Sequence, residues 1–264
     1  MTITIHRDVL QGTDEWLELR RGKLTASEMH LIITPKELKA AKSEKSRTHL
    51  HELLAQIISG NVDPSYVSDA MVQGDYDESV ARLRYEEETK QEVDADIGFI
   101  EREFPLYVDD DGNAVESVDD AGNSIGVETF VIGFSPDGKI RLLQAGIECK
   151  SRMMKHQVAT ILADEMPDDF ALQVHTGMLV ADWEWIDFVS YCGGLPMMVK
   201  RIFRNQKYDD VIIAAARAFN QQLRKDRKRF DDITSNPLRF FPTVRVRVRD
   251  MDTQPSDTGA PNAD

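Results

Sequence analysis

Two acidic residues and a lysine stand at a spacing suited to a metal-dependent catalytic site. Asp137 lies in a Ser-Pro-Asp-Gly turn, and Glu148 and Lys150 follow eleven and thirteen positions later, in a strand-like run over residues 144–150. Because side chains alternate along a strand, Glu148 and Lys150 share one face and Cys149 points to the other. Two carboxylates can hold a hard divalent cation, and a neighbouring lysine can orient a water against a phosphodiester. The pattern predicts Asp137 and Glu148 as metal ligands and Lys150 as a catalytic residue.

A second candidate site lies near the N-terminus, at the start of a short helix. Thr25-Ala26-Ser27-Glu28 matches a capping box, in which Thr25 caps the helix and Glu28 reaches back. Free backbone N–H groups at a helix start, two hydroxyl groups and the Arg20 guanidinium can together bind an anion. Arg20, Thr25 and Ser27 are thus compatible with an anion site. The alternative, an ordinary helix cap with a surface arginine, is favoured when the motif is taken by itself.

The residues around this second site resemble the opening motif of a known family. Residues 16–27 read Trp-x-x-Leu-Arg-x-Gly-x-Leu-Thr-Ala-Ser. This is similar to the motif of the lambda exonuclease (YqaJ-like) family of viral recombination nucleases, which belongs to the PD-(D/E)XK superfamily. The acidic pair and lysine fit the superfamily pattern, and the resemblance runs in the family's order over residues 9–190.

The resemblance adds residues to the metal site. Glu78, four positions after Gly74, is similar to a helical acid that joins the metal centre. Gln173 is similar to a glutamine that lies beside the catalytic lysine. The implied metal ligands are the carboxylates of Asp137, Glu148 and Glu78 and the backbone carbonyl of Cys149. The implied catalytic residues are Asp137, Glu148, Lys150, Glu78 and Gln173.

The resemblance also extends the phosphate site. Ser135, just before Pro136, is similar to a family serine near the DNA phosphate. The implied binding site for a DNA 5′-phosphate comprises Arg20, Thr25, Ser27 and Ser135. Two positions depart from the family pattern, because Phe170 stands where a tyrosine is common and His175 stands where a second glutamine is common.

Activity, cofactor and partners are implied by the resemblance alone. It implies an exodeoxyribonuclease that degrades one strand of double-stranded DNA 5′→3′ from an end, with Mg²⁺ as cofactor and Mn²⁺ as a substitute. It also implies a toroidal homotrimer threaded by DNA, which delivers single strands to a strand-annealing recombinase protein in phage-type recombination. Two alternatives stay open: an endonuclease of restriction or repair type on the same core, and a non-catalytic DNA-binding module.

The elements that must position these residues read as one α/β domain. Helical patterns cover residues 14–34, with a break at 21–23, and residues 46–59, 75–91, 169–180 and 209–230. Within 75–91, Val80 and Leu83 are expected to point inward. Strand patterns cover residues 99–147 with long polar loops, 183–191, 197–203 and 243–249. We expect a central mixed β-sheet flanked by helices in a PD-(D/E)XK core over residues 1–250, and a disordered tail at 251–264.

Composition excludes a membrane-spanning or disulfide-rich protein. The chain has 264 residues, a net charge of −14 and two cysteines, and it contains no apolar run of membrane-spanning length. A cytoplasmic, reducing compartment is therefore expected, in a bacterial or phage-infected cell. Charge is uneven, because residues 200–249 hold fourteen Lys or Arg against five Asp or Glu. Such asymmetry is compatible with a phosphate-binding surface on an acidic protein, but equally with one basic helix.

Overall fold

The computed structural model of the chain describes residues 2–63, 68–119 and 121–245. The chain divides into two compact units, Met1–Lys225 and Asp226–Asp264, and the division falls within helix α7 (Gln206–Thr234). Every predicted site residue lies in the first unit. The predicted tail at 251–264 lies outside the described residues, as does most of the predicted strand at 243–249, of which residues 243–245 are in no strand. The domain boundary at residue 250 stays a prediction.

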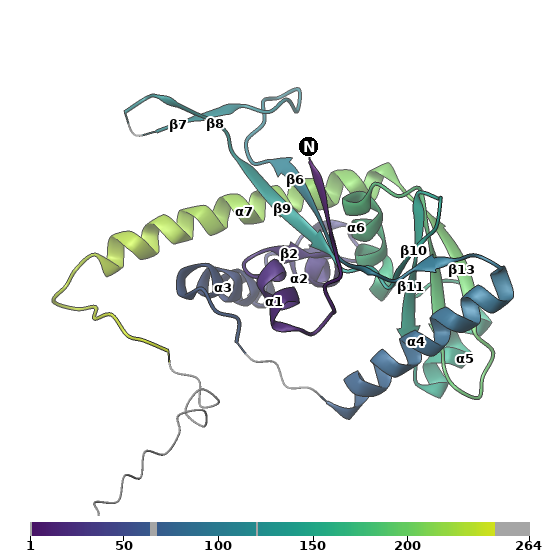
Figure 1. Cartoon of the computed structure of the whole chain (residues 1–264). Helices are drawn as coiled ribbons and strands as arrows, with labels where there is room; N and C mark the ends of the chain where they lie inside the picture. The colour runs from purple at the N-terminus through teal and green to yellow at the C-terminus, as the bar shows by residue number, and fades with distance from the viewer. Residues whose placement is uncertain (1, 64–67, 120, 246–264) are drawn as a thin grey trace, which may run out of the picture. The chain divides into compact units, whose positions relative to one another are not determined.

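The predicted mixed α/β fold is confirmed, with its strands divided between two main sheets (Figure 1). The first has the order β1-β6-β9-β2 and contains β1 (Ile3–Arg7), β6 (Ile97–Pro105), β9 (Thr129–Phe134) and β2 (Leu24–Thr25). Strand β6 is antiparallel to both β1 and β9, whereas β2 is parallel to β9. This sheet places the end of β2, with Thr25, beside the end of β9.

The second sheet carries the predicted acidic pair and lysine. Its order is β13-β12-β11-β10-β5, with β13 (Met198–Phe203), β12 (Trp185–Tyr191), β11 (Ala145–Ser151), β10 (Gly138–Ile140) and β5 (Val93–Asp94). Strands β11 and β12 are parallel, and the other pairs are antiparallel. Asp137 immediately precedes β10, and β10 pairs with β11, so the hairpin brings Asp137 close to Glu148.

Helix α6 (Ala171–Ala181) lies at the centre of the larger core. Nine of its eleven residues are buried, including Thr176 and His175, as expected for a helix that is covered on all sides. It packs against β6, β9 and β12, so it contacts both sheets. Gln173 is one of its few partly exposed residues, and its side chain leaves the core towards β11.

Helix α4 (Asp69–Thr89) covers the other face of the second sheet. Its buried residues are Ala81 and Tyr85, which pack with Ile147, Cys149 and Val189 in a smaller core. The prediction that Leu83 points inward was wrong, because its side chain is 61% exposed. Sequence spacing alone does not fix which stripe of a highly charged helix meets the sheet.

The remaining helices and strands complete the first unit. They are α1 (Asp14–Arg20), the 3₁₀ turn η1 (Ala26–Glu28), α2 (Met29–Ile32), β3 (Ile33–Thr34), β4 (Lys39–Ala40), α3 (Glu44–Ser59), β7 (Glu116–Val118), β8 (Ser124–Val127), α5 (Met154–Ala163) and η2 (Asp168–Phe170). Helix α3 ends as predicted at Gly60, which has a left-handed conformation. Helix α5 was not predicted. No helix in the described part of the chain is long and apolar enough to cross a bilayer.

Candidate active site and phosphate pocket

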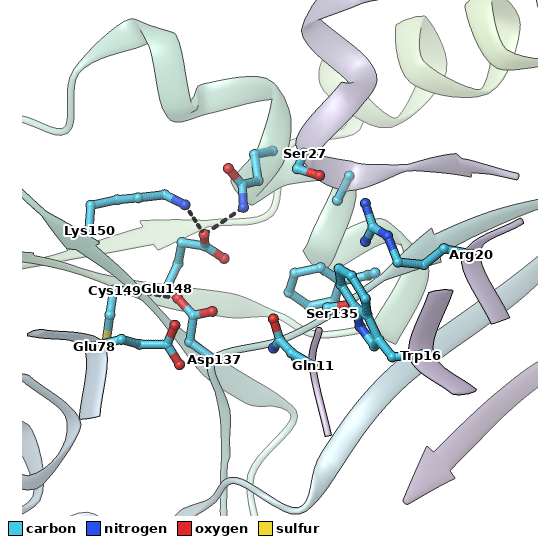
Figure 2. A pocket seen from close by; sticks show the side chains of 13 residues that line it. Gln11, Trp16, Arg20, Ser27, Glu78, Ser135, Asp137, Glu148, Cys149 and Lys150 are labelled. Carbon is cyan, nitrogen blue, oxygen red and sulfur yellow. Dashed lines mark hydrogen bonds and ion pairs between the residues drawn. The ribbon is translucent and has the colours of Figure 1, made fainter. Parts of the chain in front are cut away.

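One pocket of about 230 Å³ brings the two predicted sites together. Its wall includes all but one of the predicted residues, and Figure 2 shows their side chains in two groups around a common space. Acids and the lysine form one group: Glu78, Asp137, Glu148 and Lys150. Arg20, Ser27 and Ser135 form the other, on the far side of the pocket (Figure 2). Residues more than 100 positions apart therefore face one another.

Glu148 is the most deeply buried acid in the pocket, with a side chain that is 1% exposed. One carboxylate oxygen, Oε1, accepts hydrogen bonds from Lys150 Nζ and from Gln173 Nε2, each at 2.6 Å (Figure 2). The other oxygen, Oε2, is buried and has no hydrogen-bond partner among the described residues. As predicted, Glu148 and Lys150 act from one face of β11, while Cys149 is buried in the core beneath α4. Gln173 lies beside Lys150, as the resemblance implied.

Asp137 is held rigidly by the backbone of β11. Its Oδ2 accepts a hydrogen bond of 2.6 Å from the backbone N–H of Cys149. Burial raises the pKa of Asp137 well above its usual range, and the nearby carboxylates of Glu148 and Glu78 raise it further. The site therefore concentrates negative charge that water does not solvate.

Glu78 reaches the same pocket from helix α4. Burial raises the pKa of Glu78; Arg82 opposes this shift, and Glu148 adds to it. Arg82 stands one helical turn after Glu78, with 3.5 Å between Nη1 and Oε1. The same Nη1 donates to the backbone carbonyl of Asp137 at 3.1 Å. Arg82 was not predicted as a site residue, because a Glu–Arg pair four residues apart is an ordinary helix pattern.

Lys150 is charged in this arrangement. Burial alone would lower its pKa, but the carboxylates of Glu148, Asp137 and Glu78 outweigh that effect and raise it. Its Nζ also lies 5.5 Å from the centre of the Phe170 ring. Phe170 stands where the family commonly has a tyrosine, so it offers Lys150 a ring face but no hydroxyl group.

The acidic side of the pocket fits a divalent cation. Oε2 of buried Glu148 has no partner in the described part of the chain, and burial raises the pKa of Asp137 and Glu78, so Lys150 and Arg82 offset only part of the charge of the three acids. Oxygen donors of this kind suit Mg²⁺. Within the described residues, however, no group of three or more His, Cys, Asp or Glu side chains is gathered as a metal site. Glu148 is instead paired with Lys150, and Glu78 with Arg82.

The opposite side of the pocket is built around Arg20. Its Nη2 donates to the hydroxyl of Thr25 at 3.0 Å, and its guanidinium stacks over the Trp16 ring at 4.4 Å. Thr25 in turn donates to Glu28 at 2.6 Å and lies 3.3 Å from the Ser27 hydroxyl. Thr25 is buried behind this network and does not line the pocket, whereas Arg20 and Ser27 do.

The predicted capping box is not formed. Thr25 makes no side-chain capping hydrogen bond to η1, and its hydroxyl bonds the side chain of Glu28 instead of a backbone N–H group. The two side chains of the motif therefore meet each other. In this arrangement the Arg20 guanidinium donates to Thr25 on one side and faces the open pocket on the other side.

Two pocket residues that donate side-chain hydrogen bonds received no predicted role. Trp16 donates from its indole Nε1 to the hydroxyl of Ser135 at 2.9 Å, so one ring holds both Ser135 and Arg20. Gln11 donates to the backbone carbonyl of Pro136 at 3.4 Å. Trp16 belongs to the motif quoted above, but a tryptophan in a motif does not reveal whether it packs or positions. Both residues link the N-terminal segment to the turn that carries Asp137.

Comparisons with known proteins identify solved structures that this chain resembles. In a crystal structure of the LHK-Exo protein in complex with dAMP, the matched chain is 25% identical, with a TM-score of 0.65. The match covers 84% of this chain and 98% of that chain. The structure of the alkaline exonuclease LHK-Exo from Laribacter hongkongensis matches at 25% identity over the same shares, with a TM-score of 0.63. A search of curated protein sequences finds no match.

A family model gives the family directly. The model of the YqaJ-like viral recombinase domain matches residues 15–184, which include every predicted site residue. Together with the likeness to an alkaline exonuclease, this match makes the protein a nuclease that acts on DNA and confirms the resemblance drawn from the motifs. The chain belongs to the YqaJ-like viral recombinase family.

Proposed function

We propose that the protein is a Mg²⁺-dependent exodeoxyribonuclease that degrades one strand of double-stranded DNA from its 5′ end. The observation that carries the proposal is the shared pocket, which has carboxylates and a lysine on one side and an arginine with hydroxyl groups on the other. One side suits a cation and a scissile phosphodiester, and the other suits a terminal phosphate. A strand end bound in this way presents the bond next to its 5′-phosphate.

Each acidic residue has a distinct part in the proposed chemistry. Asp137 and Glu148 would hold the cation, with the Cys149 carbonyl and Glu78 as further ligands. The cation, when bound, lowers the pKa of a coordinated water and neutralises charge on the phosphate. Lys150 orients the attacking water and stabilises negative charge on the phosphate as an ammonium group. Gln173 fixes Glu148 through the 2.6 Å hydrogen bond, so that oxygen Oε2 stays directed away from Lys150.

The phosphate side of the pocket supports recognition of a strand end. Arg20 has a guanidinium with several N–H donors in a fixed plane, and Thr25 and Glu28 hold it in place. Ser27 and Ser135 add hydroxyl groups beside it. A terminal phosphate carries more charge than an internal phosphodiester, so this set of donors favours an end over the middle of a strand. The family resemblance assigns this end as the 5′ end, so the proposed direction of digestion is 5′→3′.

The proposed assembly and partner extend the family resemblance. A homotrimeric ring threaded by DNA would let an acidic protein stay on its substrate, because a closed ring cannot dissociate sideways from a duplex. The product would be a 3′ single-stranded tail, delivered to a strand-annealing recombinase protein. Analytical ultracentrifugation of the full chain tests the ring, and three copies per particle is the expected result.

The enzymatic proposal is tested with purified full-length protein and linear duplex DNA. Digestion should require Mg²⁺ or Mn²⁺ and stop when the cation is chelated. Lys150→Ala should abolish digestion and leave duplex binding, measured by fluorescence anisotropy in Ca²⁺, largely in place. Linear DNA that stays intact in Mg²⁺ would refute the proposal. Binding without digestion by the native protein would instead favour a non-catalytic DNA-binding module.

A further inference from the structure

Helix α4 places Glu78 in the active-site pocket and is held against strands β11 and β12 by side-chain contacts. Its buried face presents Glu78, Arg82 and Tyr85, which are four and three residues apart and so lie along one side of the helix. Arg82 contacts the turn that carries Asp137. At the N-terminal end of the same helix face, Asp77 accepts a hydrogen bond of 2.5 Å from Ser151, the residue after Lys150. The position of Glu78 therefore depends on how α4 is fastened to the sheet.

Tyr85 forms a fully buried contact between α4 and the second sheet. Its side chain is fully buried, and its hydroxyl donates to Oδ2 of Asp187 at 2.8 Å. Asp187 is 3% exposed and lies in β12, directly opposite Ile147 of β11. Ile147 immediately precedes Glu148. The hydrogen bond thus joins α4, which bears Glu78, to β12, the strand that pairs with the one bearing Glu148.

Arg201, which is opposite Asp187 on the neighbouring strand β13, also binds this carboxylate. Its Nε donates to Oδ1 at 2.9 Å and its Nη2 donates to Oδ2 at 3.0 Å, which is a two-point pairing with the carboxylate. The guanidinium also stacks 3.4 Å above the Trp185 ring. A buried carboxylate is costly unless it is fully paired, and both oxygens of Asp187 are paired here. This network is more than packing of α4 would require, because apolar side chains alone could cover the sheet.

We propose that the network of Tyr85, Asp187 and Arg201 is a positioning device for the metal site. It fixes the rotation of α4 about its own axis and its distance from the sheet, and therefore the distance of Glu78 from Asp137 and Glu148. The inference deepens the proposed function and rests on it, since it concerns Mg²⁺ binding by the same acids. None of the three residues lines the pocket, so we infer that they act only through Glu78. Loss of the Tyr85 hydroxyl leaves the core filled but releases this constraint.

The test measures Mg²⁺ binding to the full chain by isothermal titration calorimetry. Tyr85→Phe should weaken Mg²⁺ binding about tenfold, the usual effect of removing an outer contact of a metal site. Arg201→Lys should act in the same direction, because lysine cannot reproduce the two-point pairing; it also serves if Tyr85→Phe does not fold. Thr160→Val is the matched control, since it removes a buried hydroxyl from α5, outside the site. Its Mg²⁺ affinity should equal that of the native protein.

A double-mutant cycle separates positioning from general loosening of the fold. In a Glu78→Gln background, Tyr85→Phe should change Mg²⁺ affinity by less than about twofold, because the group it positions no longer carries charge. An equal loss in both backgrounds would overturn the inference, and so would an unchanged affinity in Tyr85→Phe. A native protein that binds no Mg²⁺ and digests no DNA would instead refute the proposed function. The two failures are therefore distinguishable.

Discussion

Replacing Arg20 by glutamine should remove the preference of the enzyme for a 5′-phosphate. The Arg20 side chain is 18% exposed, and it is fixed by Thr25 at 3.0 Å, by the Trp16 ring at 4.4 Å and by Glu28 at 4.0 Å. Burial lowers the pKa of Arg20 and Glu28 opposes that shift, but the guanidinium is charged at neutral pH. Glutamine keeps polarity and part of the packing while it removes the charge.

The expected magnitude follows from the contacts that would be lost. A hydrogen bond to a charged group contributes about 1.5–3 kcal/mol. Binding the phosphate requires little further ordering of the Arg20 side chain, because its neighbours already hold it in place. The ratio of kcat/KM for 5′-phosphate ends to that for 5′-hydroxyl ends should therefore fall by about 10- to 150-fold. Digestion of 5′-hydroxyl ends should change little, since that substrate never makes the contact.

The assay compares linear duplexes that differ only in the terminal phosphate. Arg21→Gln is the matched control, because Arg21 is the next residue, pairs with Glu18 at 3.1 Å and does not line the pocket. It should retain the native preference. If Arg20→Gln retained the full preference as well, the assignment of this side of the pocket to the 5′-phosphate would be wrong.

Three further outcomes are expected from buried groups. Burial and two nearby carboxylates raise the pKa of Asp137, so the metal-free protein loses stability as pH rises above about 3.9. In urea unfolding at pH 7, Asp137→Asn should therefore be at least as stable as the native protein. A less stable variant would contradict this expectation. Burial lowers the pKa of His175 to about 4, so protonation favours the unfolded chain and stability falls as pH drops from about 6.5 towards 4. His175→Gln should make the free energy of unfolding depend less on pH over this range. An unchanged pH dependence would count against the role of His175. Gly146→Ala would place a Cβ 1.9 Å from the Trp183 ring, so it should lower the free energy of unfolding by at least about 1–3 kcal/mol. Gly193→Ala has no neighbour within 4 Å and should lower it by less than about 0.5 kcal/mol. Equal losses in thermal unfolding would refute the packing argument.

The acidic residues of the site were predictable because their chemistry follows from spacing. Asp137 lies in a turn before a short strand, and Glu148 and Lys150 alternate with Cys149 along the next one, so a hairpin suffices to bring them together. The partner of Glu148 on α6, Gln173, could be assigned only from the family motif. No local pattern places a residue 25 positions further along the chain against a given strand.

Contacts between distant segments were the main omission. Arg82 reaches the carbonyl of Asp137 across 55 residues of sequence, and Trp16 reaches Ser135 across 119. Each has an ordinary local explanation, an ion pair within a helix or an apolar residue at a helix start. Helix α5 was overlooked for a related reason. Its buried side chains include the polar Gln157 and Thr160 while Leu162 is exposed, so it lacks the usual apolar stripe.

The central claim is that the pocket acts on the phosphodiester next to a 5′ end. The most direct measurement follows linear duplex DNA that carries a radiolabel at either the 5′ or the 3′ terminus, in Mg²⁺, beside a covalently closed circular duplex. The 5′ label should be released first, the 3′ label should stay on the shortening strand, and the circle should survive. Cleavage of the circle, or earlier release of the 3′ label, would contradict the account and favour an endonuclease or the opposite polarity.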